Sequence, residues 1–402
     1  MQPNSKRGLI VMDTSHSLLH RLWNNKETRS VLIQVITISI LFAFVFYIAR
    51  NVMVNLETIG KGYSFSFLGD PASYDINQTL IEYTSRSSHF RAMQVGILNT
   101  LLVAFTGVII ATIVGFILGV SRLSKNWLID KVAYGYIEYV RNVPVLLHIL
   151  LVHGLVVHSL PRPKDALSFE ETLFLTNRGF YTPKPLFEPA MWSVFIAFII
   201  GVGFTWWFMK YAKKIQNTTG KIYPVFWISL AAIIGVPLIV YFLAGAPVTW
   251  EMPYLKGFNF KDGLVIRPEF IALTMALALY TAAFIAEIVR AGIMAISHGQ
   301  TEAARALGIK ENRIMQLVVI PQALRVIIPP LSSQYLNLTK NSSLAIAIGY
   351  MDITATIGGI SLNQTGREME CMTIVLGLYL IFSLTISSFM NWYNKKMKLI
   401  ER

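Results

Sequence analysis

The chain has 402 residues, of which 54% are hydrophobic and only 14% are charged, whereas an ordinary globular domain has about 25% charged residues. So few charges cannot cover a chain of this length with a polar surface, and most of that surface must therefore face lipid. This excludes a soluble enzyme, a disordered linker and a secreted module. The single cysteine, Cys371, also excludes an internal disulfide framework and a metal site built only from cysteines.

Eight apolar runs of about 20 residues, the length that a bilayer requires, follow one another along the chain. They are 31–50, 95–120, 132–158, 191–209, 223–244, 269–291, 322–350 and 371–393. The first run starts too late and is too long for a cleavable signal peptide, so we expect it to be retained as a span. Before it, apolar residues over 18–23 repeat at helical spacing, which favours an interfacial helix.

The distribution of Lys and Arg between the spans predicts the orientation. Segments 1–30, 121–131, 210–221, 290–325 and 395–402 together carry a net charge of +15, and the alternate segments 50–91, 159–190, 245–267 and 351–370 carry −1. The positive-inside rule then places both termini in the cytoplasm. The overall charge of +13 is therefore a topology signal, and we expect no nucleic-acid partner.

The segments on the other side of the membrane are predicted from composition. Segments 159–190 and 245–268 are rich in proline and are expected to be loops. Segment 51–91 is polar and rich in Ser and Tyr, and we expect it to be only partly ordered.

The loop after the sixth span is the most informative stretch. Over 301–307 every residue after the first is a fair to strong helix former, and Glu302 lies in the first turn, where the helix dipole favours an anion. Gly308 then suits an αL cap at the end of that helix. A second short helix is expected over 311–320, with the next span beginning at Pro321.

Two short helices set at an angle, with the small side chains of Ala303 and Ala304, would form a knob that fits closely into a groove of another protein. An ordinary amphipathic loop helix between two spans explains the same local pattern. Local physical chemistry alone leaves both interpretations open.

Longer motifs favour the first interpretation. The loop contains Glu302-Ala303-Ala304, then Gly308, and then Pro321-Gln322-Ala323-Leu324-Arg325. Matching residues lie upstream, at Gly96-Ile97-Leu98-Asn99-Thr100-Leu101 and at Tyr139-Val140-Arg141-Asn142-Val143-Pro144. In this order and at this spacing they resemble the membrane permease subunits of bacterial ABC importers, and in particular their polar amino-acid branch. The resemblance covers 94–158 and 269–393.

The remaining regions, an extra first span and a long insert with two spans, resemble the longer, heterodimer-forming permease subunit of general L-amino-acid uptake systems. We therefore expect an all-α polytopic membrane protein with about eight transmembrane helices, a permease core and coupling helices. The expected regions are a cytoplasmic N-terminal segment (1–30), the extra span (31–50), an extracytoplasmic loop (51–93), the first core part (94–158), the insert (159–268), the second core part (269–393) with its coupling loop (298–321), and a cytoplasmic tail (394–402).

The resemblance implies an ATP-driven importer of L-amino acids in the bacterial inner membrane that works by alternating access. Its implied partners are two copies of an ATPase subunit, a second permease subunit, a soluble periplasmic amino-acid-binding protein and the lipid bilayer. The chain has no Gly-x-x-x-x-Gly-Lys-Ser/Thr run, so ATP and Mg²⁺ belong to the ATPase and this chain is not an enzyme. The implied coupling residues are Glu302, Ala303, Ala304 and Gly308.

In the third span, Glu138 and Arg141 are three residues apart and able to pair. Pro144 disfavours helix at the residue before it and predicts a break between helices at 127–141 and 144–158. By resemblance, Glu138, Arg141 and Pro144 belong to the cytoplasmic gate region.

In the sixth span, Glu287 and Arg290 are again three residues apart, at a depth where ionisable groups are costly. Either they form a mutual structural ion pair, or Glu287 faces the passage and meets a substrate ammonium. Tyr280 stands where the amino-acid branch usually has Asn, and Phe284 where it usually has Tyr.

In the seventh span, Pro329-Pro330 predicts a break, and a polar run follows that cannot face lipid. Its candidate passage residues are Asn337, Lys340, Asn341 and Ser342. Lys340 would contact a substrate carboxylate or anchor the span at the interface, and Asn341 stands where Asp is usual. The three departures from the usual residues, Tyr280, Phe284 and Asn341, favour an asymmetric pair in which another permease chain keeps the usual polar residues.

Three further predictions are structural. Gly115-x-x-x-Gly119 predicts close helix packing. The histidines at 148, 153 and 158 recur every five residues, which suits structural or pore-lining roles better than metal binding. We therefore expect no metal site. The uncharged insert spans are expected to face lipid. The alternative function is an ion-gradient-driven transporter or channel, in which the loop at 300–321 would have no role.

Overall fold

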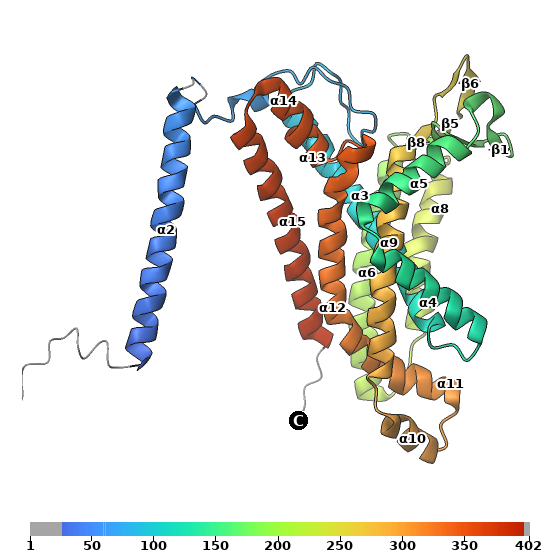
Figure 1. Cartoon of the computed structure of the whole chain (residues 1–402). Coiled ribbons are helices and arrows are strands. Elements are labelled where there is room, and N and C mark those ends of the chain that lie inside the picture. The colour runs from blue at the N-terminus through green and yellow to red at the C-terminus, as the bar shows by residue number, and fades with distance from the viewer. Residues whose placement is uncertain (1–25, 59, 61, 398–402) are drawn as a thin grey trace, which may run out of the picture. The chain divides into compact units, whose positions relative to one another are not determined.

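The computed structural model describes residues 26–58, 60 and 62–397, and the chain divides into two compact units, 1–67 and 68–402. The α-helices are α2 (Lys26–Thr58), α3 (His89–Ser121), α4 (Trp127–Asn142), α5 (Val145–Ser159), α6 (Met191–Thr219), α7 (Val225–Leu230), α8 (Val236–Leu243), α9 (Pro268–Met294), α10 (His298–Ala306), α11 (Glu311–Ile314), α12 (Ile320–Asn341), α13 (Ile353–Ala355), α14 (Leu362–Thr365) and α15 (Glu368–Met397) (Figure 1).

Short 3-10 or π segments lie between or beside these helices. They are η1 (Ser66–Gly69), η2 (Pro163–Asp165), η3 (Ala231–Gly235), η4 (Met315–Val319), η5 (Ser342–Ile348) and η6 (Thr356–Ser361). Among the described residues, seven helical segments are long and apolar enough to cross a membrane, and the bent pair of α4 and α5 adds an eighth if it is counted as one span. The predicted polytopic helical fold with about eight spans agrees with this.

The first unit contains α2, a single helix of 33 residues with no buried residue. It extends beyond the predicted span 31–50 at both ends. Nearly all of its side chains over 31–49 are apolar, such as Phe42 and Phe46, which suits a span within lipid. The interfacial helix predicted over 18–23 lies outside the described residues.

The contact between α3 and α9 forms the centre of the second unit. A Cβ atom at Gly115 would lie 2.6 Å from the Cβ of Ile285, and one at Gly119 would lie 2.7 Å from the Cβ of Val289. No larger residue fits at either position without separating the helices. The predicted packing role of this glycine pair is therefore confirmed.

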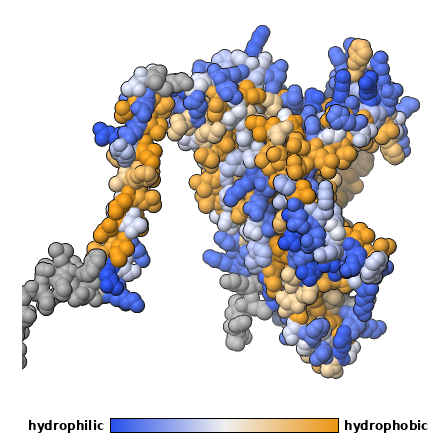
Figure 2. Space-filling view, viewed as in Figure 1, coloured by the Kyte–Doolittle hydropathy of each residue, from blue (hydrophilic) through white to orange (hydrophobic). Residues whose placement is uncertain are grey.

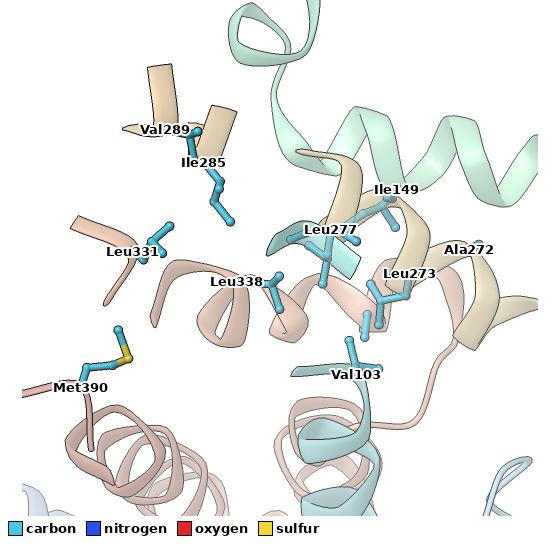
Figure 3. Close-up of a cluster of buried hydrophobic side chains, with 14 of the residues drawn as sticks. Val103, Ile149, Ala272, Leu273, Leu277, Ile285, Val289, Leu331, Leu338 and Met390 are labelled. Carbon is cyan, nitrogen blue, oxygen red and sulfur yellow. The ribbon is translucent and has the colours of Figure 1, made fainter. Parts of the chain in front are cut away.

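Large aliphatic side chains from α3, α5, α9 and α12 surround this contact (Figure 3). Leu338 of α12 is fully buried and belongs to the same cluster as Leu273 and Leu277 of α9. Gly107 of α3 leaves room for it, since a Cβ there would lie 3.2 Å from the Leu338 Cδ2. This core fixes α9 and α12, the helices that carry most of the candidate passage residues.

The chain bends by 110° between α4 and α5. Val143 is extended, with φ −111° and ψ 134°, and Pro144 is the N-cap of α5. The break predicted from Pro144 is therefore confirmed. It occurs because the proline ring disfavours helical backbone at the preceding residue.

Two predictions about the seventh span were wrong. The helix α12 continues through Pro329 and Pro330 without a break. Both rings lie on an exposed face, and a membrane helix bundle tolerates the lost hydrogen bonds. The second short helix was also expected to run over 311–320, but α11 ends at Ile314 and the π turn η4 joins it to α12, which begins at Ile320.

The insert spans pack on each other. A Cβ at Gly201 of α6 would overlap the carbonyl oxygen of Ala232 in η3, so glycine lets α6 approach the α7–η3–α8 segment closely. Their outer side chains are large, apolar and exposed, as for Ile199 (67%) and Phe226 (68%). This exposure agrees with the expectation that these spans face lipid.

The segments expected to be loops contain short antiparallel strands. A four-stranded sheet has the order β1 (Leu167–Phe169), β2 (Leu173–Thr176), β3 (Gly179–Thr182), β8 (Leu264–Ile266). Two further two-stranded sheets pair β4 (Lys184–Phe187) with β5 (Val248–Glu251) and β6 (Tyr254–Lys256) with β7 (Asn259–Lys261). In register, Tyr181 pairs with Phe174 on one side and Val265 on the other. Strands of three or four residues are too short to give a clear alternating pattern, so the prediction of plain loops was incomplete.

Residues 68–88, part of the segment expected to be only partly ordered, are held by specific contacts. The Tyr83 hydroxyl donates to the Tyr74 carbonyl oxygen at 2.8 Å, and the Tyr74 hydroxyl lies 3.0 Å from the Ser361 Oγ. The His89 Nδ1 also lies 2.8 Å from this Oγ. Tyrosine buries its ring while its hydroxyl finds a polar partner, so a Tyr-rich polar segment can pack well.

Candidate coupling loop and translocation path

The loop between α9 and α12 forms a compact pair of short helices at the end of the bundle opposite the strands (Figure 1). Ser297 caps α10 by accepting from the Gly299 amide at 3.3 Å. Gly308 has φ +74°, the predicted αL conformation, and its amide donates to the Arg305 carbonyl at 2.8 Å. The Arg305 side chain then pairs with Glu311 of α11 at 2.5 Å, which fixes the angle between the helices.

The predicted coupling residues do not share one surface. Glu302 and Ala303 are exposed, whereas Ala304 is only 5% exposed and packs against Ile314. Ala304 therefore holds the two helices together instead of meeting a partner. Leu307, which sequence reasoning missed, is 80% exposed at the tip of the loop. An apolar residue directly before a capping glycine was the available signal.

The hydrogen bond between Arg305 and Glu311 holds the pKa of the Glu311 carboxyl below its usual value. Both side chains are exposed, and an exposed ion pair contributes little to stability. The pair is therefore better suited to orienting the loop than to stabilising it.

In the gate region the expected pairing of Glu138 with Arg141 does not form. The Asn142 side-chain amide donates to the Glu138 carbonyl oxygen at 2.8 Å, with the Glu138 Oε2 at 3.4 Å. The Arg141 guanidinium lies over the Phe284 ring instead, 5.7 Å from its centroid. Asn142 lies four residues after Glu138 on the same face of α4, and Phe284 of α9 offers an aromatic face to Arg141. Pro144 is exposed at the bend.

Aromatic rings collect where the bend meets α9. The His148 ring centroid lies 5.8 Å from that of Tyr139 and 5.7 Å from that of Tyr280, which lies 5.1 Å from Phe284. The His148 Nε2 is buried and has no hydrogen-bond partner among the described residues. A buried polar atom without a partner is unusual and marks a place where a further polar group can be received.

Glu287 lies on the same face of α9, seven residues after Tyr280. Its carboxylate accepts from the Arg290 Nη2 at 2.9 Å and from its Nε at 3.1 Å. Both side chains are partly exposed. Of the two interpretations, the structure forms the mutual ion pair, which neutralises both charges within the span.

Polar residues of α12 form one stripe on the exposed side of the helix. Ser333, Asn337 and Lys340 are exposed and Asn341 is half-buried, at positions i, i+4, i+7 and i+8. We call these four residues the α12 polar stripe. Within the described part of the chain, none of them is hydrogen-bonded to another helix. Polar side chains on a membrane span must face a partner subunit or a wet cavity, because lipid cannot satisfy them.

Ser342, the last candidate of the polar run, lies outside the stripe. It is fully buried, and its hydroxyl donates to the Thr339 carbonyl at 2.7 Å and lies 3.3 Å from the Tyr379 hydroxyl. Tyr379 donates to the Asp352 Oδ2 at 3.0 Å. Ser342 therefore belongs to a buried polar network.

Asp352 is the centre of that network and was missed by sequence reasoning. It is fully buried and caps α13, with its Oδ1 accepting from the Ala355 amide at 2.9 Å. Burial raises the pKa of its carboxyl to about 6, although the hydrogen bonds from Ala355 and Tyr379 oppose this. An Asp followed by three helix-compatible residues was the available signal.

The apolar spans, the exposed coupling loop and the α12 polar stripe define a multi-pass membrane transport component. Residues 217–399 match the family model described as binding-protein-dependent transport system inner membrane component. The chain is 47% identical over 374 residues to the general L-amino acid transport system permease protein AapQ of Rhizobium johnstonii, covering 93% of each chain. It is 46% identical to the glutamate/glutamine/aspartate/asparagine transport system permease protein BztB of Rhodobacter capsulatus, over 93% of this chain and 95% of that one.

The chain belongs to this family of inner membrane transport components. It is thus a membrane-spanning permease subunit of an ABC importer and not an enzyme, and the ion-gradient-driven alternative no longer applies. A solved structure of an amino acid ABC transporter with histidines is also similar, at 22% identity and a TM-score of 0.46, covering 77% of this chain and 95% of that one.

Proposed function

We propose that this subunit moves L-amino acids inward by alternating access, with the α12 polar stripe lining the passage. The carrying observation is that stripe, because Asn337 and Lys340 are exposed on a membrane span and have no partner on another helix of the described chain. The amino-acid class is supported by the relatives, whose names give general L-amino acids and glutamate, glutamine, aspartate and asparagine.

The proposed orientation puts both termini and the loop between α9 and α12 in the cytoplasm, and the strands outside. It is supported by the charge of the segments between the spans, +15 on one side and −1 on the other. A soluble binding protein would then deliver its amino acid to the end of the bundle that carries the strands.

In this proposal the coupling loop takes force from a separate ATPase subunit, present in two copies that hold ATP and Mg²⁺. Glu302, Ala303 and Leu307 form the exposed surface available to an ATPase groove. The αL turn at Gly308 and the ion pair of Arg305 with Glu311 hold α10 and α11 in a fixed orientation. A displacement of α10 by the ATPase would therefore move α11 and, through it, α12.

A second, different permease subunit completes the passage. Tyr280 and Phe284 present aromatic rings where the family branch usually has polar side chains, and the α9 pair of Glu287 with Arg290 is internally neutralised. An amino acid needs partners for both its ammonium and its carboxylate, because an unpaired charge in a dry cavity costs several kcal/mol. Lys340 supplies one partner and the second subunit supplies the other.

The test is uptake of radiolabelled amino acids into proteoliposomes that contain this chain, the second permease and the ATPase, with the binding protein added outside. Uptake should require enclosed ATP and every subunit. Robust uptake without the second permease would contradict the asymmetric pair. Uptake that follows a proton or sodium gradient without ATP would contradict the whole proposal.

A further inference from the structure

The insert between α5 and α9 contains a cavity of about 470 Å³ that lies apart from the coupling loop and the α12 polar stripe. It is lined by Arg162, Pro163, Lys164, Asp165, Asn177, Arg178 and Phe258. These residues come from η2, from the turn between β2 and β3, and from the turn between β6 and β7. Hydrophilic residues gather at this end of the unit in Figure 2.

The cavity concentrates positive charge. The segments 159–190 and 245–267 hold seven Lys or Arg and six Asp or Glu, so the insert outside its spans is nearly neutral. Three of the seven cations, Arg162, Lys164 and Arg178, line this one cavity, against one acid. Within the described residues none of the three forms an ion pair. An excess of unneutralised cations in a concave site attracts an anion.

Two of the three cations, Arg178 and Lys164, contact the hairpin of β6 and β7. The Arg178 Nη1 donates to the Phe258 carbonyl oxygen at 3.0 Å, and the Lys164 Nζ lies 4.9 Å from the centroid of the Phe258 ring. The hairpin is itself fixed to the sheet, because the Tyr181 hydroxyl donates to the Asn259 Oδ1 at 2.8 Å. These two side chains are therefore positioned before a ligand binds, so binding loses less of their conformational entropy.

The cavity also presents acceptors. The side-chain Oδ1 of Asn177 is buried and has no hydrogen-bond partner among the described residues. The backbone amide of Asn177 donates to the Pro161 carbonyl oxygen at 2.8 Å, which fixes the turn. The Asp165 carboxylate also lines the cavity and forms no ion pair among the described residues. An amide oxygen and a carboxylate accept hydrogen bonds only, so they require a donor such as an ammonium group.

We propose that this cavity binds a free dicarboxylic amino acid, separately from the translocation path. The three cations receive the two carboxylates, and Asp165 with the Asn177 Oδ1 receives the ammonium. A ligand with two carboxylates and one ammonium has a net negative charge, which matches a cavity with more cations than anions. The inference stands on the chemistry of the cavity and does not require the proposed import mechanism.

The test is equilibrium binding of radiolabelled L-glutamate to the complete complex in nanodiscs without ATP. The double variant Arg162→Gln with Lys164→Gln should bind at this site at least about tenfold more weakly, because it loses two charge-assisted contacts. Lys256→Gln is the matched control, since Lys256 is an exposed cation on β6 outside the cavity. Unchanged binding in the double variant, or an equal loss in the control, would overturn the site.

A second measurement tests the ammonium contact and does not depend on the double variant. Wild-type complex should bind glutamate more tightly than glutarate, which has both carboxylates and no ammonium. Asp165→Asn should remove most of that preference while glutarate binding stays equal or improves. A preference that survives this substitution would overturn the assignment of Asp165.

Discussion

At the scale of single residues, Asp352 makes the stability of the folded protein depend on pH. Its carboxyl is fully buried, and burial raises its pKa from the ordinary value of 3.8 to about 6. The folded protein therefore binds this proton more tightly than the unfolded chain does. The cost of the buried carboxylate is present above about pH 6 and disappears below about pH 4, and it amounts to about 3 kcal/mol at about 1.4 kcal/mol per pH unit.

We expect the thermal midpoint of the purified protein to rise between pH 7.5 and pH 5 because of this group. Asp352→Asn should reduce that rise, since its amide can still accept from Ala355 and donate to the Tyr379 hydroxyl. Differential scanning calorimetry of both proteins between pH 7.5 and pH 5 measures the change in the thermal midpoint. An equal pH dependence in the two proteins would show that Asp352 does not titrate there.

Lys340 is the residue of the α12 polar stripe that carries the charge. Lys340→Met keeps the length of the side chain and removes the ammonium, so a substrate carboxylate loses its partner. Uptake should fall about 10- to 100-fold, from about 1.5–3 kcal/mol for a hydrogen bond to a charged group. Lys210→Met is the control, because Lys210 is also exposed but lies over Trp206 in the insert. Similar uptake by both variants would remove Lys340 from the path.

The residues that sequence reasoning found and missed differ in a physical way. Pro144 and Gly308 act on their own backbone, so their effects follow from local stereochemistry. Asp352 had a local helix-capping signal, but its burial and that of the His148 Nε2 depend on distant segments, which no local pattern encodes. Glu138 does not pair with Arg141 for a similar reason, because the distant helix α9 offers the Phe284 ring to the Arg141 guanidinium.

At the scale of elements, the coupling loop allows a matched comparison of two glycines. Gly308 has φ +74° and Gly220, after α6, has φ +73°, and a Cβ at either position meets no atom within 4 Å. Gly308→Val and Gly220→Val therefore impose the same backbone strain, about 1–2 kcal/mol. Only Gly308→Val should uncouple transport, because only that turn sets α10 against α11.

The measurement is ATP hydrolysis stimulated by the loaded binding protein, together with uptake, for both variants inserted at equal levels. Normal stimulation and uptake in Gly308→Val would contradict the coupling role of the loop. An equal loss in Gly220→Val would mean that the strain acts through general stability and not through coupling.

The elements themselves were largely predictable because a bilayer imposes length and hydrophobicity on each span. The exceptions lie where other forces act. Pro329 and Pro330 lie within a continuous helix whose other side is packed through buried Leu331 and Leu338. The strands of the insert depend on pairing between segments some 80 residues apart, such as Phe180 with Ile266, which local composition does not reveal.

At the scale of the whole molecule, the insert spans should remain outside the passage. Cysteines at Ile199 and Phe226, both exposed and in uncharged spans, should react little with a charged thiol reagent in membranes. Asn337→Cys should react readily, and bound amino acid should protect it. Native Cys371 is fully buried and gives a low background. A labelled stripe across 191–244 that substrate protects would overturn this arrangement.

The central claim is that a separate ATPase drives this permease through the tip of the coupling loop, and cross-linking tests it most directly. Leu307→Cys places a thiol at a strongly exposed position of the loop (80%), and Lys221→Cys places one in the turn after α6 as a control. In the assembled complex, Leu307→Cys should cross-link to the ATPase subunit with an efficiency that changes when ATP binds, and the cross-link should stop uptake. Lys221→Cys should form no such product. Cross-linking at Lys221→Cys but not at Leu307→Cys, in a complex that still imports amino acids with ATP, would contradict the account.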